Sequence, residues 1–197
     1  MSLPPEAEPA GVDRADALHV AAVVEAARAA APVEGPTVVV AIDGRSGSGK
    51  TLLGTAVAQQ LGCPVVHLDA IYPGWDGLAE GVAHVTEHVL GPVSRGEPAS
   101  YRRWDWMRSR PGRTVPVEPS GHLVVEGCGA LVPPAVRYAA VRVWVEAADD
   151  TRRRRALSRD GETYAPHWER WAAQEDAVYA VASPRDSAHL VLRTDRP

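Results

Sequence analysis

The chain has 197 residues, of which 45% are hydrophobic and 23% charged, and its formal net charge at pH 7 is −4. This length suits one compact domain, and the acidic balance argues against a general affinity for nucleic acid or for acidic membranes. No apolar run is long enough to span a bilayer, and the two cysteines, Cys63 and Cys128, lack metal-ligand spacing. We therefore expect a cytoplasmic protein with reduced thiols, and whether it forms a homo-oligomer is left open.

The predicted elements alternate between helices and strands. Residues 1–11 are acidic and rich in proline, which predicts a disordered tail rather than a basic signal peptide. Helical periodicity is found at 12–30, 50–61, 78–96, 149–161 and 165–182. Short apolar runs typical of buried strands are found at 37–43, 63–69, 122–127, 141–147 and 188–194. Residues 97–121 form an irregular, aromatic and basic segment with room for short edge strands.

This order of elements predicts one α/β domain over residues 12–197, with a five-stranded, mostly parallel sheet flanked by helices. In such a sheet, ligands bind at the carboxyl ends of the strands. Polar residues that follow the expected strands are therefore the first candidates for a functional site.

Residues 44–51, GRSGSGKT, follow the first expected strand, open a helix and match the pattern G-x-x-x-x-G-K-[ST]. Glycines allow a tight loop whose N–H groups point at phosphate oxygens, and the helix N-terminus adds positive partial charge. Lys50 is the only lysine among 21 basic residues, and its compact ammonium suits such a cradle better than a guanidinium. The pattern predicts a P-loop NTPase fold. We expect the nucleotide to contact Gly44, Ser46, Gly47, Ser48, Gly49, Lys50, Thr51 and Leu52.

Other motifs narrow the class of nucleotide enzyme. The guanine-reading pattern N-K-x-D is absent, and no apolar strand ends in Asp-Glu as it does in motor and transporter ATPases. A small kinase, an ATP-dependent ligase or a chaperone remains.

Four further segments resemble the uridine kinase group of P-loop nucleoside kinases and, more loosely, pantothenate kinase. They are HLDAIYPGWD (67–76), RRWDW (102–106), VVEG (124–127) and TRRRRALSRD (151–160). The resemblance covers residues 37–195 and implies a kinase that uses ATP and Mg²⁺, with a lid over 149–165. The chain departs from the family after the last segment, where the family's further arginine-rich lid turn is missing.

Carboxylates follow two of the expected strands. Asp69 should face the phosphate loop, and the resemblance implies that it is the base that takes the proton of the acceptor hydroxyl. Glu126 is expected to hold Mg²⁺ directly or through water, with Thr51 and Asp69 as further metal-binding candidates. The structural alternatives are a turn or helix cap for Asp69 and a purely structural hydrogen bond for Glu126.

The lid segment carries Arg152, Arg155 and Arg159 at helical spacing on one face. Together with Lys50 they are predicted to act in catalysis by stabilising charge on the transferred phosphoryl group. The alternative is an ordinary solvated helix face.

Six residues are expected to bind the acceptor: Tyr72, Trp75, Asp76, Arg103, Trp104 and Asp105. Aromatic rings can stack on a base, and the resemblance implies that Asp76 accepts hydrogen bonds from sugar hydroxyls. Trp104 and Trp106 fit a hairpin core equally well.

The sequence thus predicts transfer of the γ-phosphoryl group of Mg-ATP to a hydroxyl of a small molecule, with uridine or cytidine preferred from the resemblance. Three alternatives stay open. One is another small metabolite, and one is a nucleoside monophosphate bound by Arg102, Arg103 and Arg108. The third is an ATP-binding regulator that is not a kinase.

Overall fold

The structure is a computed structural model that describes residues 15–195, with the side chain of residue 160 left out. The tail predicted at 1–11 lies outside the described residues. None of the helices formed by residues 15–195 has the length and apolar character that crossing a membrane requires.

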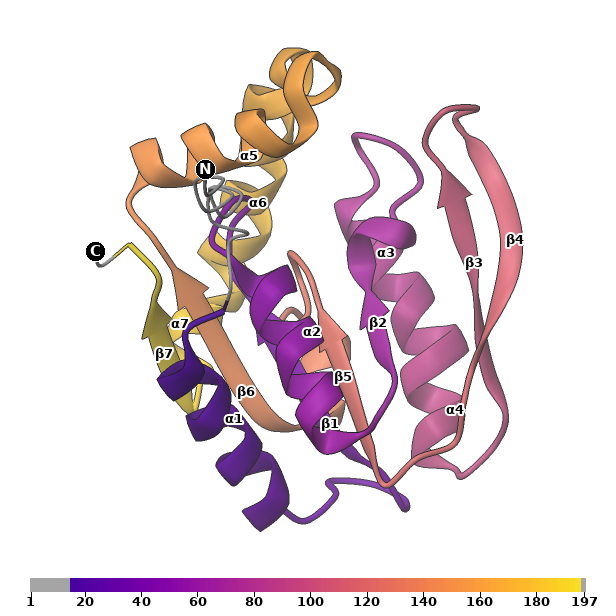
Figure 1. Ribbon diagram of the computed structural model, residues 1–197. Coiled ribbons are helices and arrows are strands. Elements are labelled where there is room, and N and C mark those ends of the chain that lie inside the picture. The colour runs from indigo at the N-terminus through magenta and orange to yellow at the C-terminus, as the bar shows by residue number, and fades with distance from the viewer. Residues whose placement is uncertain (1–14, 196–197) are drawn as a thin grey trace, which may run out of the picture.

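All five predicted strands lie in one parallel sheet (Figure 1). Its order is β2 (Val65–His67), β5 (His122–Glu126), β1 (Val38–Asp43), β6 (Ala139–Glu146) and β7 (Leu190–Arg193). The register pairs Glu126 with Ile42 on one side and with His67 on the other. The carboxyl ends of β2, β5 and β1 therefore meet at one edge, as the sequence predicts.

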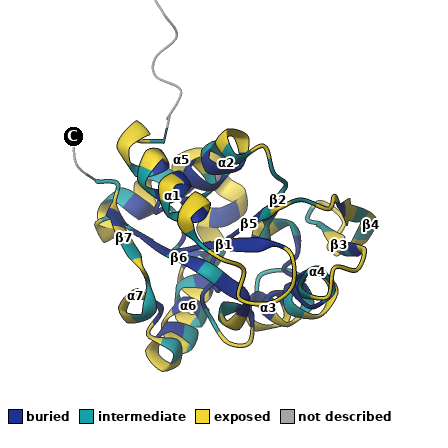
Figure 2. Cartoon of the chain, turned by 90° about the horizontal axis from the view of Figure 1, so that it is seen from below, coloured by how far each residue is buried: buried dark blue, intermediate teal, exposed yellow. Residues whose placement is uncertain are grey.

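Helices cover both faces of the sheet (Figure 2). One face carries α1 (Ala17–Ala29) and α2 (Lys50–Leu61), and the other carries α3 (Leu78–Val85), η2 (Thr86–Leu90), α4 (Gly91–Ser94) and α6 (Trp168–Ala182). Shorter helical turns complete the connections: η1 (Leu68–Ala70), η3 (Ala135–Tyr138), η4 (Ala165–His167) and α7 (Pro184–Ser187).

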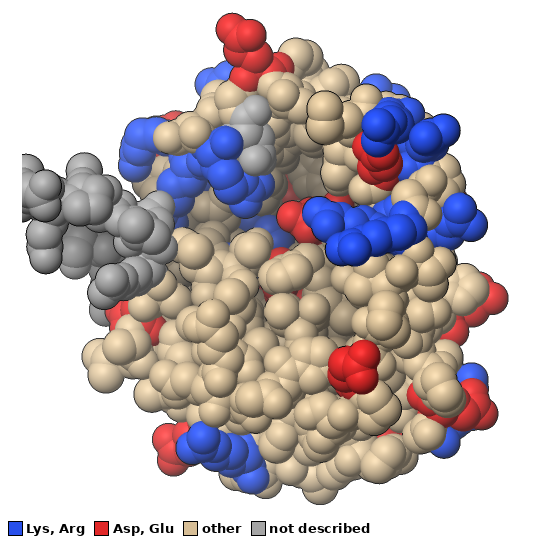
Figure 3. Space-filling model, turned by 45° about the vertical axis from the view of Figure 1, so that its right-hand side comes forward, with Lys and Arg blue, Asp and Glu red and all other residues tan. Residues whose placement is uncertain are grey.

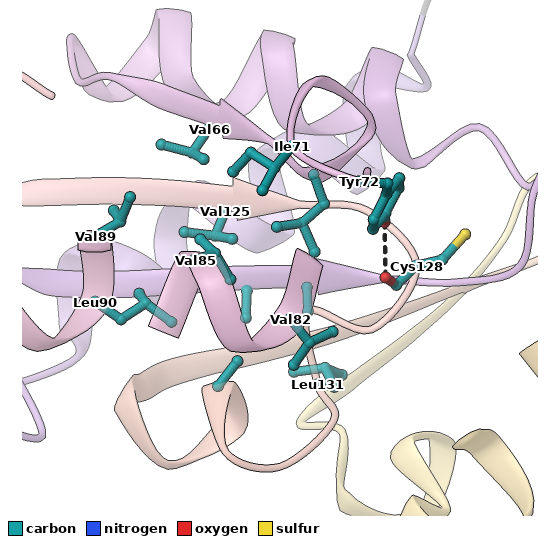
Figure 4. Packing of buried hydrophobic residues seen from close by; sticks show 14 of the residues in the cluster. Val66, Ile71, Tyr72, Val82, Val85, Val89, Leu90, Val125, Cys128 and Leu131 are labelled. Atoms are coloured by element: carbon teal, nitrogen blue, oxygen red, sulfur yellow. Dashed lines mark hydrogen bonds between the residues drawn. The ribbon is translucent and has the colours of Figure 1, made fainter. Parts of the chain in front are cut away.

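Alternate residues of β1 enter two separate hydrophobic clusters. Val40 and Ile42 pack with α1 and α2, whereas Val39 and Ala41 pack with the helices of the other face. Because both faces are covered, the strand reads as a continuous apolar run. Figure 4 shows the second cluster, in which the hydroxyl of Tyr72 donates to the carbonyl of Cys128 (2.7 Å). This packing fixes the segment after β2 beside the carboxyl edge of the sheet.

The segment 97–121, predicted to be irregular with room for short edge strands, is mostly an antiparallel hairpin of β3 (Ala99–Asp105) and β4 (Arg110–Val117). It lies beyond the β2 edge and does not join the main sheet (Figure 2). Two cross-strand pairs, Ala99 with Val117 and Tyr101 with Val115, turn apolar side chains toward the core. Apolar residues do alternate with other residues in this part of the sequence, but the arginines and prolines between them made the alternation difficult to recognise.

The lid helix α5 (Asp149–Tyr164) runs across the carboxyl edge of the sheet (Figure 1). Gly161 interrupts it with φ of 55° and ψ of −137°, close to the break predicted at 161–165. The last turn of α5 and η4 then lead into α6, so the chain crosses the carboxyl edge of the sheet before it returns along one face.

Candidate active site

The phosphate loop joins β1 to α2 over residues 44–49. Gly47 and Gly49 have φ angles of +79° and +94°, in the left-handed region that favours glycine. A Cβ atom at Gly47 would lie only 2.1 Å from the carbonyl oxygen of Arg152. The lid helix therefore packs directly on the loop, and position 47 requires glycine for both its backbone angle and its close approach.

The donors of this loop fit a polyphosphate. The first backbone bond of α2 runs from Leu53 N–H to Gly49 O (3.3 Å), so the N–H groups just before Leu53 have no carbonyl partner within the helix. Lys50 is 8% exposed and donates to Arg45 O (3.4 Å). Burial lowers the pKa of Lys50, but surrounding acidic groups outweigh that effect and raise it, so the ammonium stays charged. Leu52 lies on the same first turn with its side chain 42% exposed.

Asp43 fastens the base of the loop to the rest of the domain. Its carboxylate is fully buried and accepts hydrogen bonds from the N–H groups of Gly44, Gly129 and Leu131 and from the hydroxyl of Tyr179 (2.7–3.0 Å). Burial raises the pKa of Asp43 to about 6, although these hydrogen bonds act in the opposite direction. Asp43 thus links β1, the loop after β5, and α6.

A second buried carboxylate, Glu175 of α6, contacts the middle of the loop. Its Oε1 atom accepts hydrogen bonds from the N–H of Ser46 (2.7 Å), the indole of Trp171 (3.1 Å) and the thiol of Cys128 (3.1 Å). Its Oε2 atom lies 3.8 Å from the guanidinium of Arg45. The conformation of the loop therefore depends on a side chain 129 residues away in the sequence.

Glu126, at the end of β5, is 1% exposed and has two side-chain partners. Its carboxylate accepts from the hydroxyl of Thr51 (3.2 Å) and lies 2.6 Å from Nδ1 of His67. The contact with Glu126 raises the pKa of His67. Residues 15–195 form no cluster of three side chains suited to a metal ion. The donor set nevertheless fits Mg²⁺, which needs one or two protein carboxylates when phosphates and water complete its shell.

A cavity of about 540 Å³ opens between the loop, the strand ends and the lid. Eight of the predicted site residues line it: Ser46, Lys50, Thr51, Asp69, Tyr72, Trp75, Glu126 and Arg159. Asp69 belongs to η1, immediately after β2, and its side chain is open to the cavity. The surrounding protein displaces bulk water and, with the charge of Glu126, raises the pKa of Asp69.

An aromatic cluster around Trp75 forms part of the cavity wall. The ring of Trp75 is stacked on Tyr164 (5.2 Å between centroids, 11° between planes) and on His167 (4.5 Å, 15°), and it lies 4.8 Å from Trp106. The indole of Trp106 donates to the backbone carbonyl of Asp69 (2.9 Å). The cluster therefore joins the lid, the segment after β2 and the hairpin around the predicted base.

Of the three lid arginines, only Arg159 lines the cavity. Arg152 is 7% exposed and donates to Ser46 O (3.0 Å) and Asp149 (2.8 Å), so it supports the loop from outside. Arg155 donates to the hydroxyl and the carbonyl of Thr194. The common face predicted over the phosphates is not formed, because Arg152 and Arg155 donate to oxygens of the loop, of Asp149 and of Thr194. Figure 3 shows the remaining pattern, in which basic side chains lie on both sides of a hollow.

Four of the six predicted acceptor residues do not line the cavity. Asp76 is exposed and forms an ion pair with Arg170. Trp104 packs near Gly74. Asp105 accepts from Arg108 at the hairpin turn, and Arg103 is exposed on β3. Tyr72 and Trp75 are the two that the structure brings to the cavity.

The cavity is also lined by six residues that were not among the predicted site residues, although the first four lie in segments that the resemblance singled out: Trp106, Gly127, Thr163, Tyr164, Cys128 and Trp171. Asp43 and Glu175 were missed as well. One signal was available for the α6 residues, because Trp171, Glu175 and Tyr179 are spaced by four and place an acid in the middle of one buried helix face.

Solved structures of known proteins share this fold. A Bacillus stearothermophilus protein described as a possible uridine kinase has a TM-score of 0.65 and 18% identity, over 88% of this chain and 97% of that chain. A Silicibacter sp. TM1040 protein, described with similar reserve as a fructose transport system kinase, has a TM-score of 0.58 and 18% identity, over 87% and 98%. No family model and no curated protein matches the sequence. The chain has the fold of small P-loop kinases, as its motifs predict.

Proposed function

We propose that the protein is an ATP-dependent kinase that phosphorylates a hydroxyl group of a small molecule, with a nucleoside such as uridine or cytidine as the preferred acceptor. One observation supports this proposal above all. The Asp69 carboxylate is open to the same cavity as Lys50 and Thr51 of the phosphate loop. A protein that only binds the nucleotide has no need of a carboxylate that faces an acceptor cavity.

In the proposed step, Asp69 accepts the proton of the acceptor hydroxyl. The hydroxyl oxygen forms a bond to the γ-phosphorus while the bond to the bridging oxygen breaks, which releases ADP. Lys50 and Arg159 stabilise negative charge on the transferred group. Thr51 and Glu126 would hold Mg²⁺, which neutralises phosphate charge when it is bound.

The aromatic lining supports a flat, ring-shaped acceptor. Tyr72, Trp75, Trp106, Tyr164 and Trp171 contribute rings to the cavity wall. Nucleobases and pyranose rings both pack on such surfaces, and the motif resemblance favours a nucleoside. Because Trp75 is itself stacked on Tyr164 and on His167, only part of the ring surface of the cluster is left for the acceptor.

The proposal is tested by ADP release from Mg-ATP across a panel of nucleosides, sugars and other polyols. We expect release that depends on one class of acceptor and that falls about 100-fold or more in Asp69→Asn. Asp186→Asn, which changes an exposed aspartate on α7, serves as the matched control and should behave as wild type. Slow hydrolysis that no acceptor accelerates and that Asp69→Asn leaves unchanged would point to a nucleotide-binding regulator instead.

A second candidate, a kinase for an acceptor that already carries a phosphate, is favoured by the charge of the hairpin. Residues 99–117 contain five arginines and a single acid, Asp105, in a chain whose net charge is −4. Asp105 pairs with Arg108, and among the described residues Arg103, Arg110 and Arg113 have no ion-pair partner. Uridine and uridine monophosphate, compared as acceptors for wild type and Arg103→Gln, separate the two candidates. A preference for the monophosphate that Arg103→Gln abolishes would establish the second.

A further inference from the structure

One buried face of α6 contacts the phosphate loop and the cavity wall together. Trp171, Glu175 and Tyr179 follow one another at intervals of one helical turn, and all three are at least nine-tenths buried. Trp171 lines the cavity, Glu175 accepts from Ser46 N–H, and Tyr179 donates to Asp43 at the base of the loop. Asp176, the residue after Glu175, forms an ion pair with Arg45 (2.6 Å). α6 is therefore bound to the last residue of β1, Asp43, and to two residues of the loop, Arg45 and Ser46.

The chemistry around Glu175 requires a carboxylate. Its three partners at Oε1 are all donors, an amide N–H, an indole N–H and a thiol, and its other oxygen faces a guanidinium. A carboxylate is an acceptor at both oxygens, whereas a glutamine amide must place its NH₂ against either the donors or Arg45. Burying an acid beside a site for phosphates is unfavourable unless its hydrogen bonds compensate. Here the compensating hydrogen bonds tie the acid to the phosphate loop and to the cavity wall.

Ser46 is the loop residue whose N–H donates to Glu175. It lines the same cavity as Lys50, Thr51 and Asp69, so this part of the loop lies where the transferred group and the acceptor would meet. Arg152 binds its carbonyl oxygen from outside (3.0 Å), and Glu175 binds its N–H from inside (2.7 Å). The peptide groups on both sides of Ser46 are thus held by side chains from α5 and α6.

We propose that Glu175 is a positioning residue for phosphoryl transfer, which holds Ser46 so that the phosphate loop presents the transferred group to the acceptor in a fixed place. Glu175 does not act on the substrate itself. Glu175 acts through Ser46, and the indole of Trp171, on the cavity side, orients the Glu175 carboxylate. The proposal rests on the proposed kinase function for its kinetic consequence, but the contact on which it depends can be tested without catalysis.

The kinetic test compares Glu175→Gln with Glu169→Gln, which changes an exposed glutamate on the first turn of the same helix. In Glu175→Gln we expect kcat to fall about tenfold or more, since a hydrogen bond to a charged group is lost, and KM for ATP to stay within about threefold. Rates are normalised to the fraction of protein that binds ADP in calorimetry, so that partial unfolding does not count. Wild-type kcat after this normalisation, or an equal loss in Glu169→Gln, would overturn the proposal.

A second variant tests the link through Trp171. Trp171→Phe keeps a ring in the wall but removes the indole donor to Glu175. It should lower kcat less than Glu175→Gln does, and the double variant should be no slower than Glu175→Gln alone, because both changes affect one interaction. Effects that simply multiply would refute the link.

The hydrogen bond from Ser46 N–H to Glu175 is tested by amide hydrogen exchange at Ser46 in the nucleotide-free protein. Protection of this amide should fall about tenfold or more in Glu175→Gln and stay at the wild-type level in Glu169→Gln. If the wild type transfers no phosphoryl group to any acceptor, the proposed function fails while this measurement still decides the role of Glu175. Unchanged protection in Glu175→Ala, which removes the acceptor altogether, would show that Glu175 does not hold the loop.

Discussion

The buried carboxylate of Asp43 should make the stability of the protein depend on pH. Its pKa in the folded protein, about 6, lies above the ordinary value of 3.8 because burial disfavours the charged form. The folded chain therefore binds this proton more tightly than the unfolded chain does. Its contribution to stability is fully present below the unfolded pKa and is lost as pH rises through the folded one. The total is about 3 kcal/mol at about 1.4 kcal/mol per pKa unit, and about 1 kcal/mol of it falls between pH 5 and pH 7.

Asp43→Asn isolates this effect, because asparagine keeps a side-chain oxygen for several of the same donors but does not titrate. Urea unfolding of both proteins at several pH values gives the difference in unfolding free energy, wild type minus variant. This difference should fall by about 1 kcal/mol from pH 5 to pH 7, whatever its value at either end. Asp186→Asn, at an exposed site, should give a difference that does not vary with pH. A constant difference for Asp43→Asn, or one that grows with pH, would refute the reasoning.

Three further substitutions test the parts of the site separately. Gly47→Ala should weaken ADP binding about tenfold or more in calorimetry, because a Cβ would lie 2.1 Å from Arg152 O at a positive φ; wild-type affinity would contradict this. Lys50→Arg should lower kcat about 100-fold, because a guanidinium does not fit the buried position of the ammonium; a fully active variant would show that the lysine is not required. Trp106→Phe removes the donor to Asp69 O but keeps a ring. The KM for the acceptor should therefore rise about threefold to tenfold while the affinity for ADP stays the same. Weaker ADP binding would show that Trp106 supports the nucleotide site rather than the acceptor site.

Features encoded by neighbouring residues could be predicted from the sequence. The five apolar runs became the five strands of one sheet, and GRSGSGKT became the loop between β1 and α2. Asp69 and Glu126 line one cavity because parallel strands bring their carboxyl ends together, which chain order alone implies.

Features that depend on tertiary contacts could not be predicted. Asp43 and Glu175 have partners 136 and 129 residues away, so no local pattern marks them as supports of the loop. Helical spacing placed Arg152 and Arg155 correctly on a lid helix, but spacing does not reveal that backbone oxygens of Ser46 and Thr194 accept from them. For residues 97–121 the sequence allowed short edge strands but did not give their pairing, because apolar positions there alternate with arginine and proline.

The most direct test of the proposed function is identification of the product by mass spectrometry after incubation with Mg-ATP and single acceptors. The account predicts one class of ring-bearing hydroxyl compound that gains a phosphoryl group in wild type and does so far more slowly in Asp69→Asn. ATP turnover with every acceptor recovered unmodified, at equal rates in the two proteins, would contradict it.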